Sequence, residues 1–322
     1  MEHGHSGASS AVVRARAREK LRRDLGDAFL HAFGDPDTVE IMLNADHRLW
    51  QERLGEGMRC VGSMRPSQSE AVIKTIAGYY GKEITRAHPV LESEFPLDGS
   101  RFAAQLPPIV RAPTFALRKK AVSIFGFDDY VAAGTMTCAQ RDLLLDAIRR
   151  HRNILVIGGT GSGKTTLINA VIREMVRLDE RERVFIIEDT GEIQCMAENF
   201  VQYRTSPDID MTRLLRTSLR MRPDRILVGE VRGPEALDLL MAWNTGHEGG
   251  AATLHANDAK AGLSRLSLLI SMHRDAPRLI EPLIGEAVHL LVHIARTVGG
   301  RRVQDIVAVD GYENGRYLLR TL

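Results

Sequence analysis

The feature that most constrains the fold of this chain is a glycine-rich motif in its second half. The motif reads Gly158-Gly159-Thr160-Gly161-Ser162-Gly163-Lys164-Thr165, and Thr166 follows it. A short apolar run precedes the motif at residues 153–157, and apolar residues at helical spacing follow it over residues 167–176. In this setting the glycines let backbone N–H groups surround phosphate oxygens, Lys164 reaches the β and γ phosphates, and the Thr165 hydroxyl binds Mg²⁺. The motif therefore predicts a nucleotide-binding α/β domain built around a phosphate loop.

Composition fits a folded chain with more than one domain. The chain has 322 residues, and at about 150 residues per domain this length favours two domains. It is 44% hydrophobic and its formal net charge is +2, so no overall charge excess indicates nucleic acid or an acidic membrane as partner. The three cysteines are far apart and form no CxxC pair, as expected in a reducing cytosol. We find neither a signal peptide nor an apolar stretch of transmembrane length.

The first third of the sequence predicts a tail, a helix and a small domain. Residues 1–34 read as a Gly, Ser and His rich tail followed by a basic amphipathic helix. Such a helix could lie on an anionic membrane or pack its apolar stripe on the body of the protein. Residues 35–120 are expected to form a small α+β domain, with strands at 39–44, 48–53, 101–110 and 115–119 and a helix at 67–80. Residues 121–137 resemble a linker.

From residue 138 to residue 322 the pattern becomes that of an α/β domain. Helical segments alternate with short continuous apolar runs at 153–157, 184–187, 225–228 and 251–254. These runs are too short for helices and predict buried strands of a largely parallel sheet. Two helices and three alternating strands, at 289–297, 302–310 and 316–319, are expected to complete the domain.

Polar residues that end these apolar runs are the other candidate site residues. Glu188 and Asp189 follow one run, Glu230 follows the next, and His247 and His255 flank the last. Ligands of an open parallel sheet bind at the carboxyl ends of its strands. Each of these side chains is therefore a candidate for contact with the γ phosphate, its Mg²⁺ or an attacking water.

Four motifs, taken in order and spacing, give the chain a family resemblance. They are the phosphate loop, Ile187-Glu188-Asp189-Thr190, the Walker B sequence Ile226-Leu227-Val228-Gly229-Glu230-Val231-Arg232-Gly233, and the segment from Thr245-Gly246-His247 to Thr253-Leu254-His255-Ala256-Asn257. Together they resemble the type II/type IV secretion traffic ATPase superfamily, and the chain is most similar to conjugative transfer ATPases of the TrbB type. The resemblance covers residues 35–320, including Val39-Glu40-Ile41-Met42-Leu43-Asn44 and residues 101–118.

The resemblance implies a RecA-like core after a smaller α+β domain, with ATP and Mg²⁺ as ligands and a homohexameric ring. It also implies roles for individual residues. Glu188 and Glu230 would serve Mg²⁺ and the attacking water, and His255 and His247 would sense the γ phosphate. Arg101 and Arg118 would be the N-domain arginines that touch phosphate, with three competitors elsewhere: Arg204, Arg220 and Arg222.

The sequence departs from the family pattern at two places. Walker B sequences usually have an Asp before the Glu, whereas Gly229 stands here. A Mg²⁺ ligand is thereby missing, and the general base could be either Glu188 or Glu230. The four-cysteine insertion that type II secretion ATPases commonly carry is absent from the sequence, which argues against that branch.

The hypothesis that follows is an ATP-hydrolysing motor of a type IV secretion or conjugation system. It would be a cytoplasmic protein, peripheral on the inner membrane, with other proteins of the apparatus as partners. A nucleic-acid translocase, a motor of the type IV pilus kind and a nucleotide-dependent switch are the alternatives. Aromatic residues make up only 5% of the chain, so a stacking channel for nucleic acid is not indicated, although direct nucleic-acid binding stays open.

Overall fold

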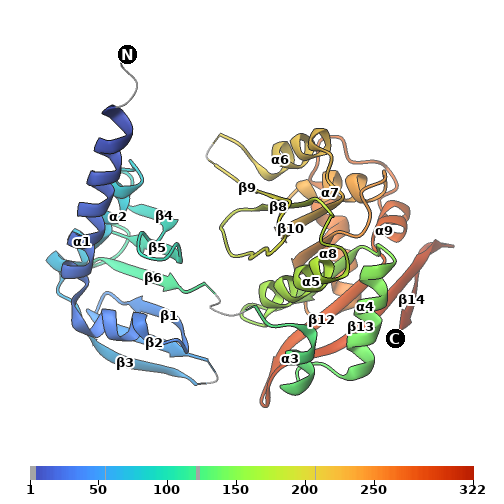
Figure 1. Cartoon of the computed structure of the whole chain (residues 1–322), viewed down its shortest axis with the longest axis horizontal. Helices are drawn as coiled ribbons and strands as arrows, with labels where there is room; N and C mark the ends of the chain where they lie inside the picture. The colour runs from blue at the N-terminus through green and yellow to red at the C-terminus, as the bar shows by residue number, and fades with distance from the viewer. Residues whose placement is uncertain (1–4, 55, 121–123, 207) are drawn as a thin grey trace. The chain divides into compact units, whose positions relative to one another are not determined.

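The computed structural model describes residues 5–54, 56–120, 124–206 and 208–322, with side chains from Val12 onward. The chain divides into two compact units between residues 122 and 123. Each unit has its own β-sheet (Figure 1). The first unit has one apolar core, and the second has an apolar core on each face of its sheet.

The first unit is a six-stranded antiparallel sheet with two helices packed on one face. The strand order is β3-β2-β1-β6-β5-β4. The strands are β1 (Thr38–Leu43), β2 (Arg48–Arg53), β3 (Met58–Ser63), β4 (Val90–Glu94), β5 (Arg101–Gln105) and β6 (Thr114–Arg118), and the helices are α1 (His5–Gly34) and α2 (Pro66–Tyr79). Alternate strand residues such as Ile41 and Leu117 are buried in a core with both helices. The residues between them, among them Glu40 and Arg118, belong to the other face of the sheet.

Helix α1 belongs to this unit, and its two halves differ. Leu21, Leu25 and Phe29 are buried in the core, whereas Val13, nearer the start of the helix, is 61% exposed. The helix is interrupted at Gly26, which has a φ of +75° that glycine adopts at little cost. The second half of the basic helix therefore packs on the body of the protein. The predicted tail is helical from His5, and residues 1–4 lie outside the described residues.

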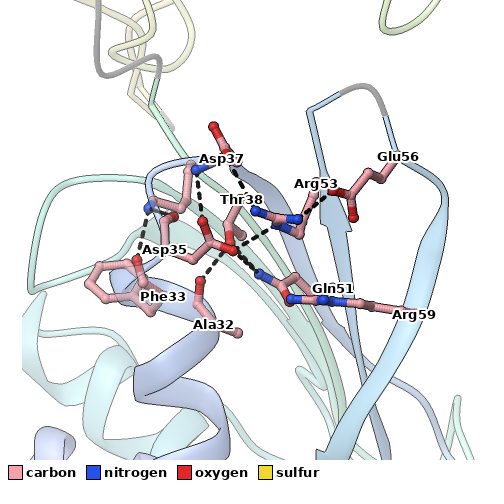
Figure 2. Close-up of polar contacts among 10 residues, drawn as sticks. Ala32, Phe33, Asp35, Asp37, Thr38, Gln51, Arg53, Glu56 and Arg59 are labelled. Atoms are coloured by element: carbon pink, nitrogen blue, oxygen red, sulfur yellow. Dashed lines mark hydrogen bonds and ion pairs between the residues drawn. The ribbon is translucent and has the colours of Figure 1, made fainter.

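A polar cluster fixes the turn between α1 and β1 to the neighbouring strands (Figure 2). The Asp35 carboxylate accepts hydrogen bonds from Arg53 Nε at 2.8 Å and from Gln51 Nε2 at 3.1 Å. The backbone N–H of Asp37, together with Arg53 and Gln51, holds the pKa of Asp35 below its usual value despite partial burial. Lys119 Nζ donates to the carbonyl of Asp35 at 3.0 Å. The end of α1 is therefore tied both to β2 and to the residue after β6.

The second unit is an α/β domain around an eight-stranded sheet of order β14-β13-β12-β7-β11-β10-β8-β9. Its central strands are parallel, and β12, β13 and β14 pair antiparallel. The strands are β7 (Ile154–Gly158), β8 (Val184–Glu188), β9 (Phe200–Arg204), β10 (Arg225–Val231), β11 (Ala251–His255), β12 (Leu290–Thr297), β13 (Gly300–Glu313) and β14 (Arg316–Thr321). The helices are α3 (Phe127–Ala132), α4 (Cys138–Arg149), α5 (Lys164–Leu178), α6 (Met211–Ser218), α7 (Glu235–Trp243), α8 (Ala259–Ser271) and α9 (Glu281–Ala287), with a 3₁₀ turn η1 (Leu219–Met221).

Both faces of this sheet are covered, which explains the continuous apolar runs in the sequence. Along β7, Leu155 and Ile157 pack into the core that contains α7 and α8, while Ile154 and Val156 pack into the core that contains α4 and α5. A strand buried on both faces needs apolar residues at every position rather than at alternate ones.

The segment predicted as a linker, residues 121–137, is in its described part a packed element of the second unit. It contains α3, and Phe127, Tyr130 and Met136 are buried in the same core as α5. The backbone N–H of Val303 donates to the Thr135 carbonyl at 2.8 Å, which joins the segment to β13. The linker interpretation is corrected for residues 124–137, because their apolar side chains are buried in the core of the second unit. Residues 121–123 lie outside the described residues.

Candidate functional site

The predicted phosphate loop lies between the end of β7 at Gly158 and the start of α5 at Lys164. Gly161 and Gly163 have φ values of +67° and +101°, a region that L side chains rarely adopt. At Gly158, a Cβ atom would lie 2.2 Å from the Ile294 carbonyl oxygen and 2.5 Å from Ser162 Oγ. Glycine is thus required at these three positions, which produces the tight loop that the motif predicts.

The loop and the start of α5 have the polar groups that a phosphate requires. Lys164 Nζ donates to the carbonyls of Gly158 at 3.0 Å and Gly159 at 2.9 Å, so the ammonium group lies against the loop. Within the described ranges no side chain caps the 15-residue helix α5, whose first turn also contains Thr165 and Thr166. Its first N–H groups and its dipole therefore fit an anion such as a phosphate.

Three further candidate residues lie at the carboxyl ends of the parallel strands, as the phosphate loop does. His255, the last residue of β11, pairs in register with Gly158 of the loop. Strands β10 and β8 run parallel to β11 and carry Glu230 and Glu188 at their carboxyl ends. The topology thus gathers the loop, both carboxylates and one histidine, as the strand-end pattern predicts.

Glu188 is buried and fully engaged by its own unit. The residue is 2% exposed. Its Oε2 accepts hydrogen bonds from the backbone N–H groups of Glu192 at 2.9 Å and Ile193 at 3.0 Å, and its Oε1 accepts from Gln202 Nε2. Burial raises the pKa of Glu188, although these hydrogen bonds oppose the rise. Its oxygens already have partners, and the carboxylate acts as an anchor for the backbone after β8.

Glu230 is more accessible and has a different partner. Its side chain is 27% exposed and forms an ion pair with Arg232, at 2.5 Å between Nη2 and Oε2. Arg232 also lies 3.4 Å from Asp189. Of the two predicted carboxylates, Glu230 is therefore the one whose oxygens can exchange a surface ion pair for water or a metal.

The glycine that replaces the usual Walker B Asp has a packing explanation. A Cβ atom at Gly229 would lie 2.9 Å from Glu188 Cβ, too close for any side chain. The Gly229 carbonyl accepts a hydrogen bond of 2.6 Å from Thr253 Oγ1, which ties β10 to β11. The close approach of β8 and β10 at this point thus excludes an Asp at residue 229.

The structure separates the two predicted histidines. His247 precedes β11 and His255 ends it, so the two residues lie at opposite ends of the strand. Gly249, two residues after His247, lies against His151, which precedes β7. The phosphate loop follows β7 and so lies at the other end of that strand. The expectation that His247 contacts the phosphate within this unit is therefore corrected, because β11 extends between it and the site.

The candidate arginines are also separated by topology. Arg204 is the last residue of β9 and pairs with Glu188 of β8. It therefore lies at the carboxyl ends of the parallel strands, where the phosphate loop also lies. Arg220 and Arg222 come immediately before β10 and therefore lie at the amino ends of the parallel strands. In the first unit, Arg101 and Arg118 face each other across β5 and β6, and Arg118 Nε lies 3.6 Å from Glu40.

The sequence assigned no separate role to three residues near the phosphate loop. Arg232 pairs with Glu230, and Glu235 Oε1 accepts hydrogen bonds from the backbone N–H groups of Arg232 at 2.7 Å and Gly233 at 2.8 Å. A Glu shortly after Gly-Pro at the start of a helix could have indicated this N-terminal role for Glu235. The third residue, Arg301, donates from Nε to the Gly161 carbonyl at 3.2 Å, and it lies too far along the chain for any local signal.

The donor set fits Mg²⁺ in one particular way. Among the described residues no group of three or more His, Cys, Asp or Glu side chains could enclose a metal ion. Mg²⁺ is commonly bound by one or two protein ligands together with substrate phosphates and waters. Thr165 and Glu230, beside a phosphate loop, match that mode, whereas Glu188 already accepts three hydrogen bonds.

Comparisons with known proteins agree with this arrangement. The family model described as "Type II/IV secretion system protein" matches residues 84–310. The probable conjugal transfer protein TrbB of Sinorhizobium fredii is 48% identical, covering 94% of this chain and 92% of that protein. Conjugal transfer protein TrbB of Rhizobium radiobacter is 47% identical, covering 94% and 93%.

A solved structure shows the same fold. The ATPase DotB of Legionella pneumophila has a TM-score of 0.63 at 23% identity, covering 85% of this chain and 77% of that one. The predicted fold class, an α/β core after a smaller α+β unit, is confirmed, and so is the resemblance to TrbB-type proteins. Within the described residues, no helix is both long and apolar enough to cross a bilayer. Since the family model covers most of the chain, the protein belongs to the type II/IV secretion system protein family.

Proposed function

We propose that the protein is a Mg²⁺-dependent ATPase that works as a homohexameric motor in conjugative DNA transfer. One observation carries the ATPase part of the proposal: a glycine loop with its lysine, an accessible carboxylate and a histidine meet at one edge of a parallel sheet. The role in conjugation is supported by two relatives that are named as conjugal transfer proteins.

In this proposal the residues of the second unit share the work of phosphoryl transfer. Lys164 and the N-terminus of α5 would hold the β and γ phosphates, and His255 would contact the γ phosphate. Thr165 and Glu230 would hold Mg²⁺, which when bound supplies charge neutralisation on the phosphate oxygens. Glu230 would also orient the attacking water, since Glu188 is occupied by three hydrogen bonds.

The remaining roles belong to the whole assembly. Arg101 and Arg118 would supply positive charge to the phosphates from the first unit, and Arg204, at the loop edge, is the competing residue. A ring of subunits at the cytoplasmic face of the inner membrane would act with other proteins of the secretion apparatus. The first unit, which includes α1, would serve as the N-terminal domain, and the second unit, which includes α3, would serve as the ATPase domain.

Neutralising Glu230 tests the proposal most selectively. We expect Glu230→Gln to retain nucleotide binding and to lose turnover by about 10² or more, the usual effect of removing a catalytic base. The control is Glu313→Gln, at an exposed position at the end of β13, which should turn over ATP at the wild-type rate. Full turnover by Glu230→Gln would contradict the assigned role.

The biological role needs a separate readout. A donor strain that lacks its own copy should regain plasmid transfer when it expresses the wild-type protein or Glu313→Gln. The same strain should not regain transfer with Glu230→Gln. Transfer restored equally by all three proteins would show that turnover is not the output, as in a nucleotide-dependent switch.

A further inference from the structure

The hairpin formed by β12 and β13 extends past the phosphate loop. Strand β12 pairs with β7 up to His293 and Ile157, and β12 then continues to Thr297 beyond the end of β7. The carbonyl of Ile294 lies against Gly158, as the 2.2 Å distance to a Cβ built there shows. Strand β13 returns along β12 from Gly300, with Arg301 opposite Arg296. The tip of the hairpin therefore lies beside the loop.

Arg301 is the hairpin residue whose side chain donates a hydrogen bond to the loop. Its Nε donates to the Gly161 carbonyl at 3.2 Å. Its Cδ lies 2.9 Å from the point where a Cβ of Gly163 would be, so the aliphatic part of the side chain packs on that glycine. In the described part of the chain, Arg301 forms no ion pair with a carboxylate within 4.0 Å. Its neighbour Arg302 is exposed.

The order of strands shows which end of a nucleotide Arg301 would meet. The strand order β13-β12-β7-β11-β10-β8 places β11, β10 and β8, which carry His255, Glu230 and Glu188, on one side of β7. Arg301 lies on the other side. An extended nucleotide with its γ phosphate toward Glu230 and its nucleoside on the opposite side of β7 would reach the hairpin. Arg301 would meet the nucleoside of a nucleotide bound in this direction.

Aromatic side chains from the segment before α4 lie on the same side. Burial raises the pKa of the Tyr130 hydroxyl in α3, and the positive charge of Arg301 acts in the opposite direction. The ring of Phe125, which is 41% exposed, contacts Tyr130 edge to face at 6.5 Å between centroids. Figure 1 shows α3 beside the start of β13. Phe125 is the exposed ring of this pair, because Tyr130 is buried in the core.

We propose that Arg301 is a nucleotide-binding residue whose guanidinium plane stacks on the base. Guanidinium groups stack on aromatic faces, and such stacking tolerates any base because each base has a π face. The ligand class is therefore a nucleoside di- or triphosphate without strong preference for its base. This inference rests on the proposed function, since it assumes that the loop binds nucleotide phosphates.

The test separates binding of the base from binding of the phosphates. Binding of ADP and of inorganic pyrophosphate, each with Mg²⁺, is measured by calorimetry for the wild type, Arg301→Ala, Arg301→Lys and the control Arg302→Ala. We expect Arg301→Ala to bind ADP about tenfold more weakly, within the range for loss of one stacking contact, and to bind pyrophosphate unchanged. Arg301→Lys should lose most of the same affinity, because lysine keeps the charge without the plane. Arg302→Ala should match the wild type.

Several outcomes would overturn the inference. Equal losses for ADP and pyrophosphate would mean that Arg301 only shapes the loop through Gly161. No loss for ADP, or full affinity in Arg301→Lys, would exclude stacking by the guanidinium. A wild-type protein that binds neither ligand would instead overturn the proposed function itself. Thermal melting of each variant shows that the compared proteins are folded.

Discussion

Glu188 and Glu230 show how two carboxylates at the same sheet edge can differ in what they do. Glu188 is buried under Gln202 and two backbone N–H groups, whereas Glu230 forms a partly exposed ion pair with Arg232. The sequence predicts both acids at strand ends but not this difference, because the burial of Glu188 depends on β9 and on the backbone after β8. Gly229 looks like a lost metal ligand in the sequence, and the structure explains it as a consequence of the close packing against Glu188.

The raised pKa of Glu188 predicts a pH-dependent stability difference. Folding raises this pKa, so the folded state favours the protonated acid, and the contribution of the acid to stability is complete below the unfolded value of 4.5. As the pH rises from 4.5 through the folded pKa, that contribution is lost. Glu188→Gln stays neutral and avoids the loss. We therefore expect the stability of Glu188→Gln relative to wild type to increase between pH 4.5 and neutral pH, measured by urea unfolding.

The exposed residue Glu313 provides the matched control for this prediction. Glu313→Gln should show a difference from wild type that changes little over the same pH range. A difference for Glu188→Gln that is flat, or that moves against the variant as the pH rises, would contradict the assignment of burial as the dominant influence on Glu188.

At the scale of elements, the sequence predicts the strands whose apolar residues alternate or form a continuous run. It misses the strands and helices that are mostly exposed or very short. The four apolar runs correspond to β7, β8, β10 and β11. The sequence does not predict β3, β4 and β9, since they lie at sheet edges and bury too few residues to leave a periodic pattern. Helix α3 was not predicted because it is one short element between Gly126 and Gly134.

Asn153, at the entrance to β7, is an element-scale anchor that the sequence does not indicate. The residue is completely buried, and its Oδ1 accepts hydrogen bonds from the backbone N–H groups of Gly249 at 2.7 Å and Gly250 at 3.1 Å. Its Nδ2 donates to the Ala287 carbonyl at 2.8 Å. These bonds join β7 to the segments that lead into β11 and β12.

Removing this anchor should be costly. We expect Asn153→Ala to lower the free energy of unfolding by about 3 kcal/mol, because each buried backbone group left unpaired costs about 1–3 kcal/mol. The control is Asn244→Ala, which loses one exposed hydrogen bond of 3.2 Å to Glu286 and should change stability by about 0.5 kcal/mol or less. Urea unfolding at neutral pH measures both variants. Equal effects would show that the Asn153 contacts do not stabilise the sheet.

At the scale of the whole molecule, the sequence indicates two folded parts but places their division less well. The change from the α+β pattern to the α/β pattern was visible near residues 120–137, whereas the structure assigns residues 124–137 to the second unit through Phe127, Tyr130 and Met136. Which strands of the second unit become neighbours depends on tertiary pairing. For that reason the contact of Arg301 with a loop 140 positions earlier in the chain leaves no signal in the sequence.

The proposed ring is a prediction at this scale. We expect the mass of the purified protein in solution to shift toward six copies when Mg²⁺ and a non-hydrolysable ATP analogue are present. Light scattering coupled to size-exclusion chromatography measures the mass directly. A protein that stays monomeric with bound nucleotide, at concentrations where ATP is turned over, would contradict a ring motor and leave a monomeric ATPase.

The central claim is that the site formed by the phosphate loop and Glu230 of the second unit hydrolyses ATP. Steady-state turnover of purified protein tests this claim most directly. Lys164→Ala removes the ammonium group that lies against the loop, while Lys260→Ala removes an exposed lysine from α8 of the same unit. The account predicts Mg²⁺-dependent turnover in the wild type and in Lys260→Ala, and turnover at the background level in Lys164→Ala. Near wild-type turnover in Lys164→Ala would contradict the account.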